Sequence, residues 1–161
     1  MNTRFFKKTS LGLIGIEENG TAVIRLYLPG NKPENDNAAE KETPLLKEAF
    51  HQLQEYCGHK RKNFTLPLAP EGTAFMQKVW DELRRIPYGT SVSYKCIAER
   101  IGRPKAARAI GQANHRNPIA IFIPCHRVIG ADGSLGGYGG GLGMKQRLLD
   151  LEQNHEETSG R

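Results

Sequence analysis

The chain has 161 residues, enough to build a hydrophobic core in one or two small domains. Its composition, 38% hydrophobic and 25% charged, is ordinary for a globular protein, and no apolar run approaches the roughly 20 residues needed to cross a bilayer. The net charge of +6 favours polyanionic partners such as nucleic acid, although many basic proteins bind none.

The three cysteines indicate a reducing compartment. Cys57, Cys96 and Cys125 form neither an even disulfide framework nor a CxxC metal knuckle. The N-terminus is basic but lacks the apolar core of a signal peptide. We therefore expect a cytoplasmic protein, or a nuclear one if the source is eukaryotic, with no metal and no other cofactor.

The first part of the chain reads as a small α/β domain. Turn residues separate three expected strands: Thr3–Lys8, Leu11–Glu17 and Thr21–Leu28. A helix is expected over 44–57, because apolar residues recur there at spacings of three and four between Pro44 and Gly58. Residues 58–70 read as the link between the two parts of the chain, and we place the domains at 1–67 and 68–161.

The second part is expected to be mainly helical, which makes the fold class α+β. A helix over 73–85 carries an apolar stripe that belongs to the core, and the segment 86–89 ends it as a turn. Two short helices come next, 94–101 with Ser93 as its cap and 104–114, joined by a tight glycine-containing turn. That arrangement resembles a helix-turn-helix, although helical hairpins are common.

The second of these short helices has unusually small side chains. Residues 105–114 offer mainly Ala and Gly where a core helix would present Leu or Ile. Such a helix can approach another surface closely, and Arg108 would protrude if that surface were a DNA groove. A tightly packed helix pair with a solvated Arg108 is the alternative.

A candidate nucleophile lies directly after the apolar run 119–123, which reads as a buried strand or extended segment. The run delivers Cys125 and His126 at its end. A thiol with a pKa of roughly 8.5 is only a few per cent thiolate at neutral pH, so neighbouring cationic or hydrogen-bonding groups would have to activate it. A buried, inert cysteine is the alternative.

The closing segments supply two further features. Residues 133–143 hold many glycines but match no phosphate-binding fingerprint, and they suit close approach of backbone amides to a flat ligand. The helix expected over 144–154 brings Glu152 toward the core beside Leu148. An acid there is costly unless paired, and His126 would be a good partner.

At this point the sequence resembles the O6-alkylguanine-DNA alkyltransferases, also called methylated-DNA–protein-cysteine methyltransferases. The match is close from about residue 45 to 154. The matching blocks are Ile123-Pro124-Cys125-His126-Arg127-Val128, Arg108-Ala109-Ile110-Gly111, Asn117-Pro118, Gly137-Tyr138, Gly140-Gly141-Leu142 and Lys145 to Glu152, together with Ile86-Pro87-Tyr88-Gly89 upstream.

The resemblance implies an N-terminal RNase H-like domain, then a helical domain that bears a helix-turn-helix and the reactive cysteine. It makes Cys125 the alkyl acceptor and His126 a base that acts through a bound water. Glu152 would orient and charge that histidine. Asn117 would tie the helix-turn-helix to the active-site segment.

The resemblance also implies that the second short helix enters the minor groove, unlike most helix-turn-helix proteins. Arg108 would fill the gap left by a flipped nucleotide, and Tyr94 would press on the phosphate and contact the guanine edge. The implied groove-facing residues are Ala106, Ala107, Ala109 and Gly111. The implied substrate pocket holds Val128, Gly136, Tyr138 and Gly139.

The implied function is DNA repair by single-turnover, irreversible transfer of an alkyl group from O6-alkylguanine, and less from O4-alkylthymine, to Cys125. The expected partner is double-stranded DNA containing alkylated guanine, with no membrane and no obligate protein partner. We expect a monomer and leave cooperative binding to DNA open. The alternatives are a lesion-binding protein without transfer activity, which Cys125 argues against, and a cysteine hydrolase using Cys125 and His126.

Overall fold

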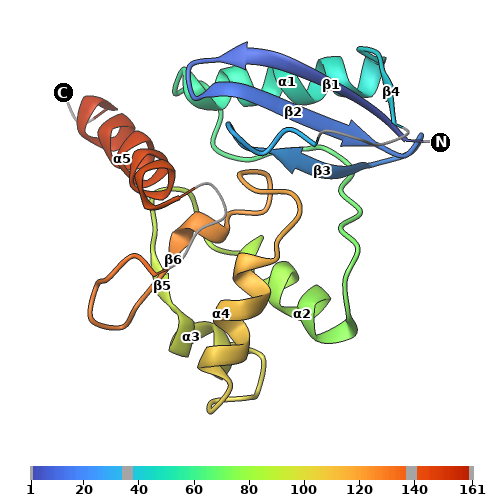
Figure 1. Ribbon diagram of the computed structural model, residues 1–161. Helices are drawn as coiled ribbons and strands as arrows, with labels where there is room; N and C mark the ends of the chain where they lie inside the picture. Colours follow the sequence, from blue (N-terminus) through green and yellow to red (C-terminus); the bar gives the residue numbers. More distant parts are fainter. Residues whose placement is uncertain (1, 34–37, 137–140, 160–161) are drawn as a thin grey trace. The chain divides into compact units, whose positions relative to one another are not determined.

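The computed structural model describes residues 2–33, 38–136 and 141–159, and these form two compact units (Figure 1). The first unit comprises residues 1–71 together with 118–122. The second comprises 72–117 and 123–161. No helix in the described part of the chain is long and apolar enough to cross a membrane.

A mixed sheet forms the first unit. Within the described residues its strand order is β3-β2-β1-β4, with bounds β1 Thr3–Thr9, β2 Gly12–Glu18, β3 Val23–Tyr27 and β4 Ala39–Glu40. The first three strands pair antiparallel, and β4 runs parallel to β1. The three strands expected from the sequence are confirmed to within about two residues at each end.

Helix α1 (Pro44–Cys57) packs against this sheet, and its predicted bounds are confirmed. Thr43 caps it by accepting the amide of Leu46, and Pro44 occupies the first helical position, where its missing N–H costs nothing. Phe50 on α1 meets Phe5 of β1 edge-on, with ring centroids 6.3 Å apart. The apolar side of α1 and one face of the sheet thus make the core of this unit.

Helices dominate the second unit. They are α2 (Ala74–Leu83), α3 (Tyr94–Arg100), α4 (Ala107–His115) and α5 (Leu142–Ser159). Thr73 and Ser93 cap α2 and α3, the latter as expected. Trp80 of α2 is fully buried and donates its indole N–H to the carbonyl of Ala113 on α4 at 2.9 Å.

Helix α4 starts later than expected. The prediction placed its start at Pro104, but 104–106 form a turn in which the Ala106 amide donates to the carbonyl of Arg103. Proline is acceptable in such a turn as well as at a helix start, so its position did not distinguish the two. Helix α4 also has no side-chain cap, since Ala106 stands at its N-cap.

Two short strands connect distant parts of the second unit. β5 (Val92–Ser93) pairs parallel with β6 (Val128–Ile129). β5 leads directly into α3, and β6 comes immediately after the short 3-10 helix η1 (Cys125–Arg127). The pair therefore holds the start of the helix-turn-helix against the segment that carries Cys125.

Residues 118–122 belong to the first unit, and they do not form a continuous strand. Ile119 makes a single parallel bridge to Leu26, and the ring of Phe122 lies 4.7 Å from that of Phe64. Ile121 has a positive φ of 74°, so the segment turns there, a conformation that strains a β-branched residue. The expected extended run is thus buried but bent.

We expect Trp80→Phe to lower the free energy of unfolding by about 1–3 kcal/mol, because the buried hydrogen bond from the indole to the carbonyl of Ala113 would be lost. Urea unfolding followed by circular dichroism measures the change. Met76→Leu, on the same helix but without that hydrogen bond, serves as the control. Equal stability of Trp80→Phe and the wild type would contradict a role for the indole N–H in joining α2 to α4.

Candidate active site

Cys125 begins helix η1 and is 4% exposed. Its amide donates to the carbonyl of Ile123 at 2.8 Å, and the pairing of β6 with β5 fixes the backbone immediately after η1. His126 and Arg127 complete η1, and both are buried. The chain thus places a thiol, an imidazole and a guanidinium together in the interior of the second unit.

The carboxylate of Glu152, on α5, is the centre of this cluster. It is 1% exposed and accepts from His126 Nε2 at 2.7 Å and from the amide of Gly89 at 2.9 Å. Arg127 adds contacts from Nε at 3.0 and 3.2 Å and from Nη2 at 3.0 Å. Burial opposes ionisation, but the hydrogen bonds from His126 and Arg127 and the charge of Arg127 outweigh it and lower the pKa of Glu152 to about 2. Glu152 is therefore an anion at neutral pH.

His126 is held neutral. Burial lowers the pKa of His126, and this outweighs the opposing effect of its hydrogen bond to Glu152. Because an ionised carboxylate only accepts, the proton of the neutral ring lies on Nε2. Nδ1 is buried and has no protein hydrogen-bond partner among the described residues. The lone pair on Nδ1 can therefore take a proton.

Two asparagines hold the backbone around Cys125. Asn117 donates from Nδ2 to the carbonyl of Ile123 at 2.8 Å, and so bridges the ends of segment 118–122. Asn114, on α4, donates to the carbonyl of Cys125 at 3.2 Å. Asn117 was expected from the sequence, but Asn114 was missed, since a hydrogen bond to a backbone carbonyl leaves no sequence pattern.

Tyr94, the first residue of α3, lies in a second polar cluster. Burial raises its pKa, and so does the nearby Cys125, so its hydroxyl is protonated at neutral pH. Lys145, fully buried on α5, lies 3.5 Å from this hydroxyl and also donates to the carbonyl of Leu135. A Cβ at Gly136 would lie 2.5 Å from the Tyr94 hydroxyl, and the positive φ of 68° at this position also favours glycine. No role was predicted for Lys145 from the sequence.

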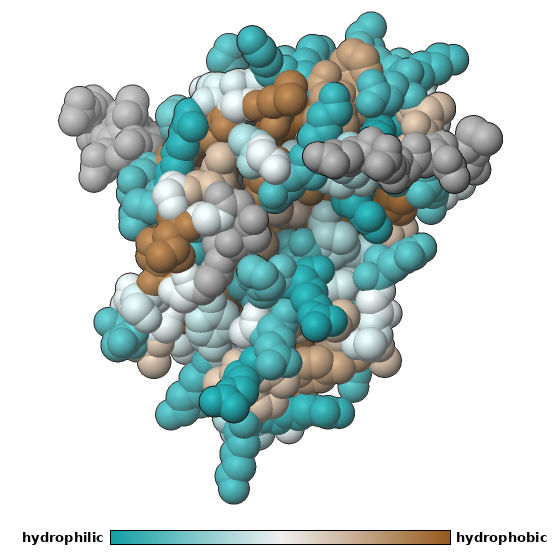
Figure 2. Space-filling view, viewed as in Figure 1, coloured by the Kyte–Doolittle hydropathy of each residue, from teal (hydrophilic) through white to brown (hydrophobic). Residues whose placement is uncertain are grey.

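Helix α4 presents an exposed Arg108 among small side chains that are partly exposed: Ala106, Ala107, Ala109 and Gly111. The helix-turn-helix is strongly basic, with six lysines and arginines and a single glutamate between residues 94 and 116. Hydrophilic side chains project from the surface around α3 and α4 (Figure 2). The shape and charge of this surface suit a polyanion.

Among the expected pocket residues, Val128 is fully buried and Gly136 lies beside Tyr94. Tyr138 and Gly139 fall outside the described residues. The structure therefore brings together Cys125, His126, Glu152, Asn117 and Tyr94, whereas Arg108 stands on the exposed side of α4.

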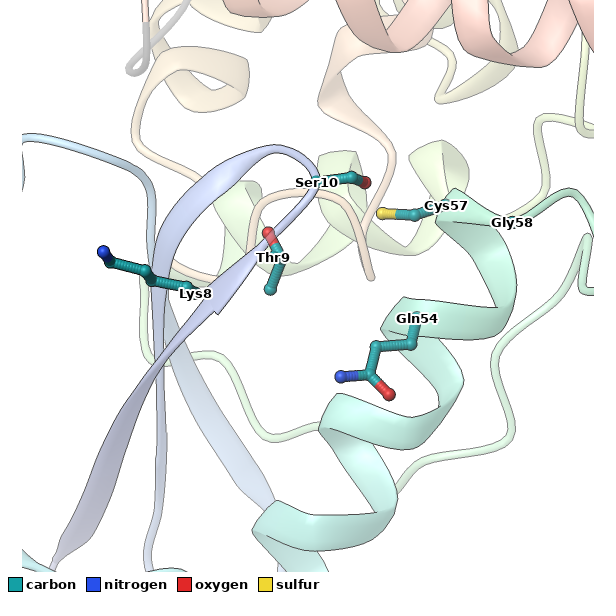
Figure 3. Close-up of a pocket in the computed structure, with 6 residues that line it drawn as sticks. All are labelled: Lys8, Thr9, Ser10, Gln54, Cys57 and Gly58. Atoms are coloured by element: carbon teal, nitrogen blue, oxygen red, sulfur yellow. The ribbon is translucent and has the colours of Figure 1, made fainter.

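A cavity of about 400 Å³ in the first unit holds none of the predicted site residues. Figure 3 shows it between the end of β1 and the end of α1, with the Cys57 sulfur and the Ser10 hydroxyl directed into it. Its lining residues are Lys8, Thr9, Ser10, Gln54, Cys57 and Gly58. The chemistry assembled around Cys125 has no counterpart there.

Comparison with known proteins identifies both units. Residues 5–70 match the ribonuclease-like domain of 6-O-methylguanine DNA methyltransferase, and residues 74–154 match its DNA binding domain. The expected fold class is thereby confirmed.

Individual relatives match over nearly the full length. The constitutive methylated-DNA–protein-cysteine methyltransferase of Bacillus subtilis is 48% identical over 159 residues, which cover 95% of this chain and 96% of that protein. The crystal structure of Mycobacterium tuberculosis O6-methylguanine methyltransferase has a TM-score of 0.89 at 39% identity, covering 96% of this chain and 94% of that one. Mycobacterium tuberculosis OGT in complex with DNA gives 0.88 at 39% identity, with coverage of 95% and 94%.

These matches account for both units and for the order in which they occur. The chain belongs to the 6-O-methylguanine DNA methyltransferase family.

Proposed function

We propose that the chain repairs DNA by moving the alkyl group of O6-alkylguanine, and less readily that of O4-alkylthymine, onto its own Cys125. The observation that carries this proposal is the buried Cys125 followed in the chain by a neutral His126, whose Nε2 lies 2.7 Å from an ionised Glu152. The relatives' activity, transfer from methylated DNA to a protein cysteine, is the one that this arrangement suits.

DNA is the partner, and the helix-turn-helix is the proposed contact surface. The small side chains of α4 let its backbone approach the floor of the minor groove, and the basic residues around it release counterions from the phosphates. Cys125 is buried, so the reacting base must leave the duplex to meet it. Flipping a nucleotide costs a few kcal/mol, and the exposed Arg108 can offset part of this by filling the gap in the stack.

In the transfer step, the thiol proton of Cys125 passes through a water to Nδ1 of His126. Nε2–H stays bonded to Glu152, which stabilises the imidazolium that forms. The sulfur then forms a bond to the alkyl carbon as the bond from that carbon to O6 breaks. The bond's electron pair leaves on the guanine, which takes up a proton from water, and the imidazolium of His126 returns the former thiol proton to the solvent. The thioether has no route back, so each molecule acts once.

The neighbouring groups position the base. Tyr94 keeps its hydroxyl proton at neutral pH and can donate to the guanine edge or to a phosphate. Asn114 links α4 to the carbonyl of Cys125, and Asn117, just beyond α4, donates to the carbonyl of Ile123, so that seating of α4 on DNA and placement of the thiol are coupled. Val128 contributes an apolar wall. We also propose Tyr138 and Gly139 as pocket residues, on the family resemblance alone.

Incubation with a duplex carrying one O6-methylguanine should add a single methyl group per protein molecule, on the Cys125 peptide. Intact mass followed by peptide mapping measures this. Cys125→Ala should bind the lesion duplex but gain no mass, whereas Cys57→Ala, a change in the first unit, should react like the wild type. Tight lesion binding by the wild type with no mass gain would instead identify a damage-recognition protein.

Arg108→Ala should slow transfer from a fully paired lesion by at least about tenfold. Without the arginine, nothing fills the gap in the base stack, so the free-energy cost of flipping the nucleotide is no longer partly offset. The loss should be smaller when the lesion lies opposite an abasic site, where little pairing has to be broken. Single-turnover rates on the two duplexes test this, with Lys105→Ala as the matched removal of a nearby charge. An equal loss on both duplexes would contradict a role in flipping.

Acid should destabilise the protein through Glu152 and His126. The pKa of Glu152 is about 2 in the fold against an ordinary 4.5, so its ionisation stabilises the fold by roughly 3 kcal/mol above about pH 5, and this is lost as the pH falls toward 2. The lowered pKa of His126 acts in the same direction below about pH 6.5, because the unfolded chain binds that proton more readily. Urea unfolding across this range should show the loss, and Glu152→Gln should show a much smaller one. If Glu152→Gln lost as much stability in acid as the wild type, the loss could not come from protonation of Glu152.

A further inference from the structure

Arg127 is the residue of the buried cluster that the proposed chemistry does not use. Its side chain is 6% exposed, and all three of its nitrogens donate to named acceptors. Nε and Nη2 bond to Glu152, and Nη1 donates to the carbonyl of Ile86 at 2.7 Å. The guanidinium also lies 5.7 Å from the ring centroid of Tyr88. A guanidinium held by this many hydrogen bonds is fixed in orientation, and it is charged at every accessible pH.

Among the described residues that contact the Glu152 carboxylate, the charges balance when His126 is neutral. One carboxylate faces one permanent cation, Arg127, and one group that can gain a proton, His126. A protonated His126 would leave two buried cations against one anion, which is costly where water is excluded. Without the guanidinium, His126 and Glu152 would instead form an ion pair of their own, with a proton on both ring nitrogens.

We propose that Arg127 is a positioning residue that neutralises Glu152 and thereby keeps His126 uncharged, with its proton on Nε2 and the Nδ1 lone pair available to accept the proton of Cys125. Arg127 touches no reacting atom and acts through Glu152. The inference rests on the proposed transfer to Cys125. Its consequence is that the protein stays reactive on the acidic side of neutrality, where an ordinary histidine paired with a carboxylate would be protonated.

The other charged groups around His126 do not replace this effect. On α5 these groups are Glu152 and Lys145, and on η1 the group is Arg127. Helix α2 also packs against η1, but its buried residues are Val79, Trp80 and Leu83, which carry no charge. Lys145 acts in the same direction as Arg127 but has no hydrogen bond to Glu152 among those of the described residues. Arg127 therefore sets the charge of the pair.

The test is the pH dependence of single-turnover transfer at saturating O6-methylguanine duplex. Arg127→Met should be about tenfold slower than the wild type near pH 6, because the midpoint of its acidic limb should lie about one pH unit above that pH, and the difference should close above about pH 8. Arg127→Lys keeps the charge and should restore most of the rate near pH 6. Arg84→Met, which removes an exposed arginine of the same unit, should leave the profile unchanged. A loss for Arg127→Met that is equal at every pH would overturn the proposal, and so would a matching shift in Arg127→Lys.

Nitrogen NMR of histidine-labelled wild-type protein provides a second readout that needs no variant to fold. At neutral pH, His126 should show one protonated nitrogen, Nε2, and one bare nitrogen, Nδ1. A doubly protonated His126 at that pH would overturn the proposal. Peptide mapping tests the proposed acceptor residue independently of the NMR test of the charge on His126. A methyl group found on a residue other than Cys125 would refute the proposed acceptor, while the NMR signals would still report the charge of His126.

Discussion

The buried carboxylate of Glu152 receives hydrogen bonds from two separate stretches of the second unit, helix η1 and the turn that ends at Gly89. Both of its oxygens are used, and its ionisation is maintained by donors rather than by water. The position of His126, the orientation of Arg127 and the path of the chain after α2 all depend on it. A neutral residue of the same shape would leave several buried donors without a strong acceptor.

The second unit also joins the proposed DNA-binding surface to the reactive thiol through short, direct links. β5 and β6 pair immediately before α3 and immediately after η1. Asn114 carries a hydrogen bond from α4 to the carbonyl of Cys125 itself. Because the side chain of Asn114 connects α4 to the backbone of Cys125, a displacement of α4 moves the backbone that carries the thiol. The proposed groove-binding helix and the proposed nucleophile are thereby mechanically coupled.

Local patterns in the sequence predicted most of the fold. Helix α1 could be bounded to the residue because Pro44 and Gly58 flank a regular apolar stripe. The predicted start of α4 was wrong, since Pro104 suits a turn as well as a helix. The left-handed backbone of Ile121 has no local cause, because β-branched residues normally avoid it. Glu152 could be recognised as an acid on an apolar face, whereas its second partner, Arg127, could not be recognised by spacing because it adjoins His126 in the chain.

Burial of the acceptor thiol has a consequence for the working life of the protein. A molecule that acts once must keep its sulfur reduced between synthesis and its single encounter with a lesion. Oxidation of cysteine increases with exposure, and Cys125 is 4% exposed while Cys57 and Cys96 are partly accessible to solvent. Peroxides and electrophilic metabolites therefore react first with the two more exposed thiols, Cys57 and Cys96. Burial therefore protects the Cys125 thiol from oxidation, and under the proposed function only a flat base that enters the site would reach it.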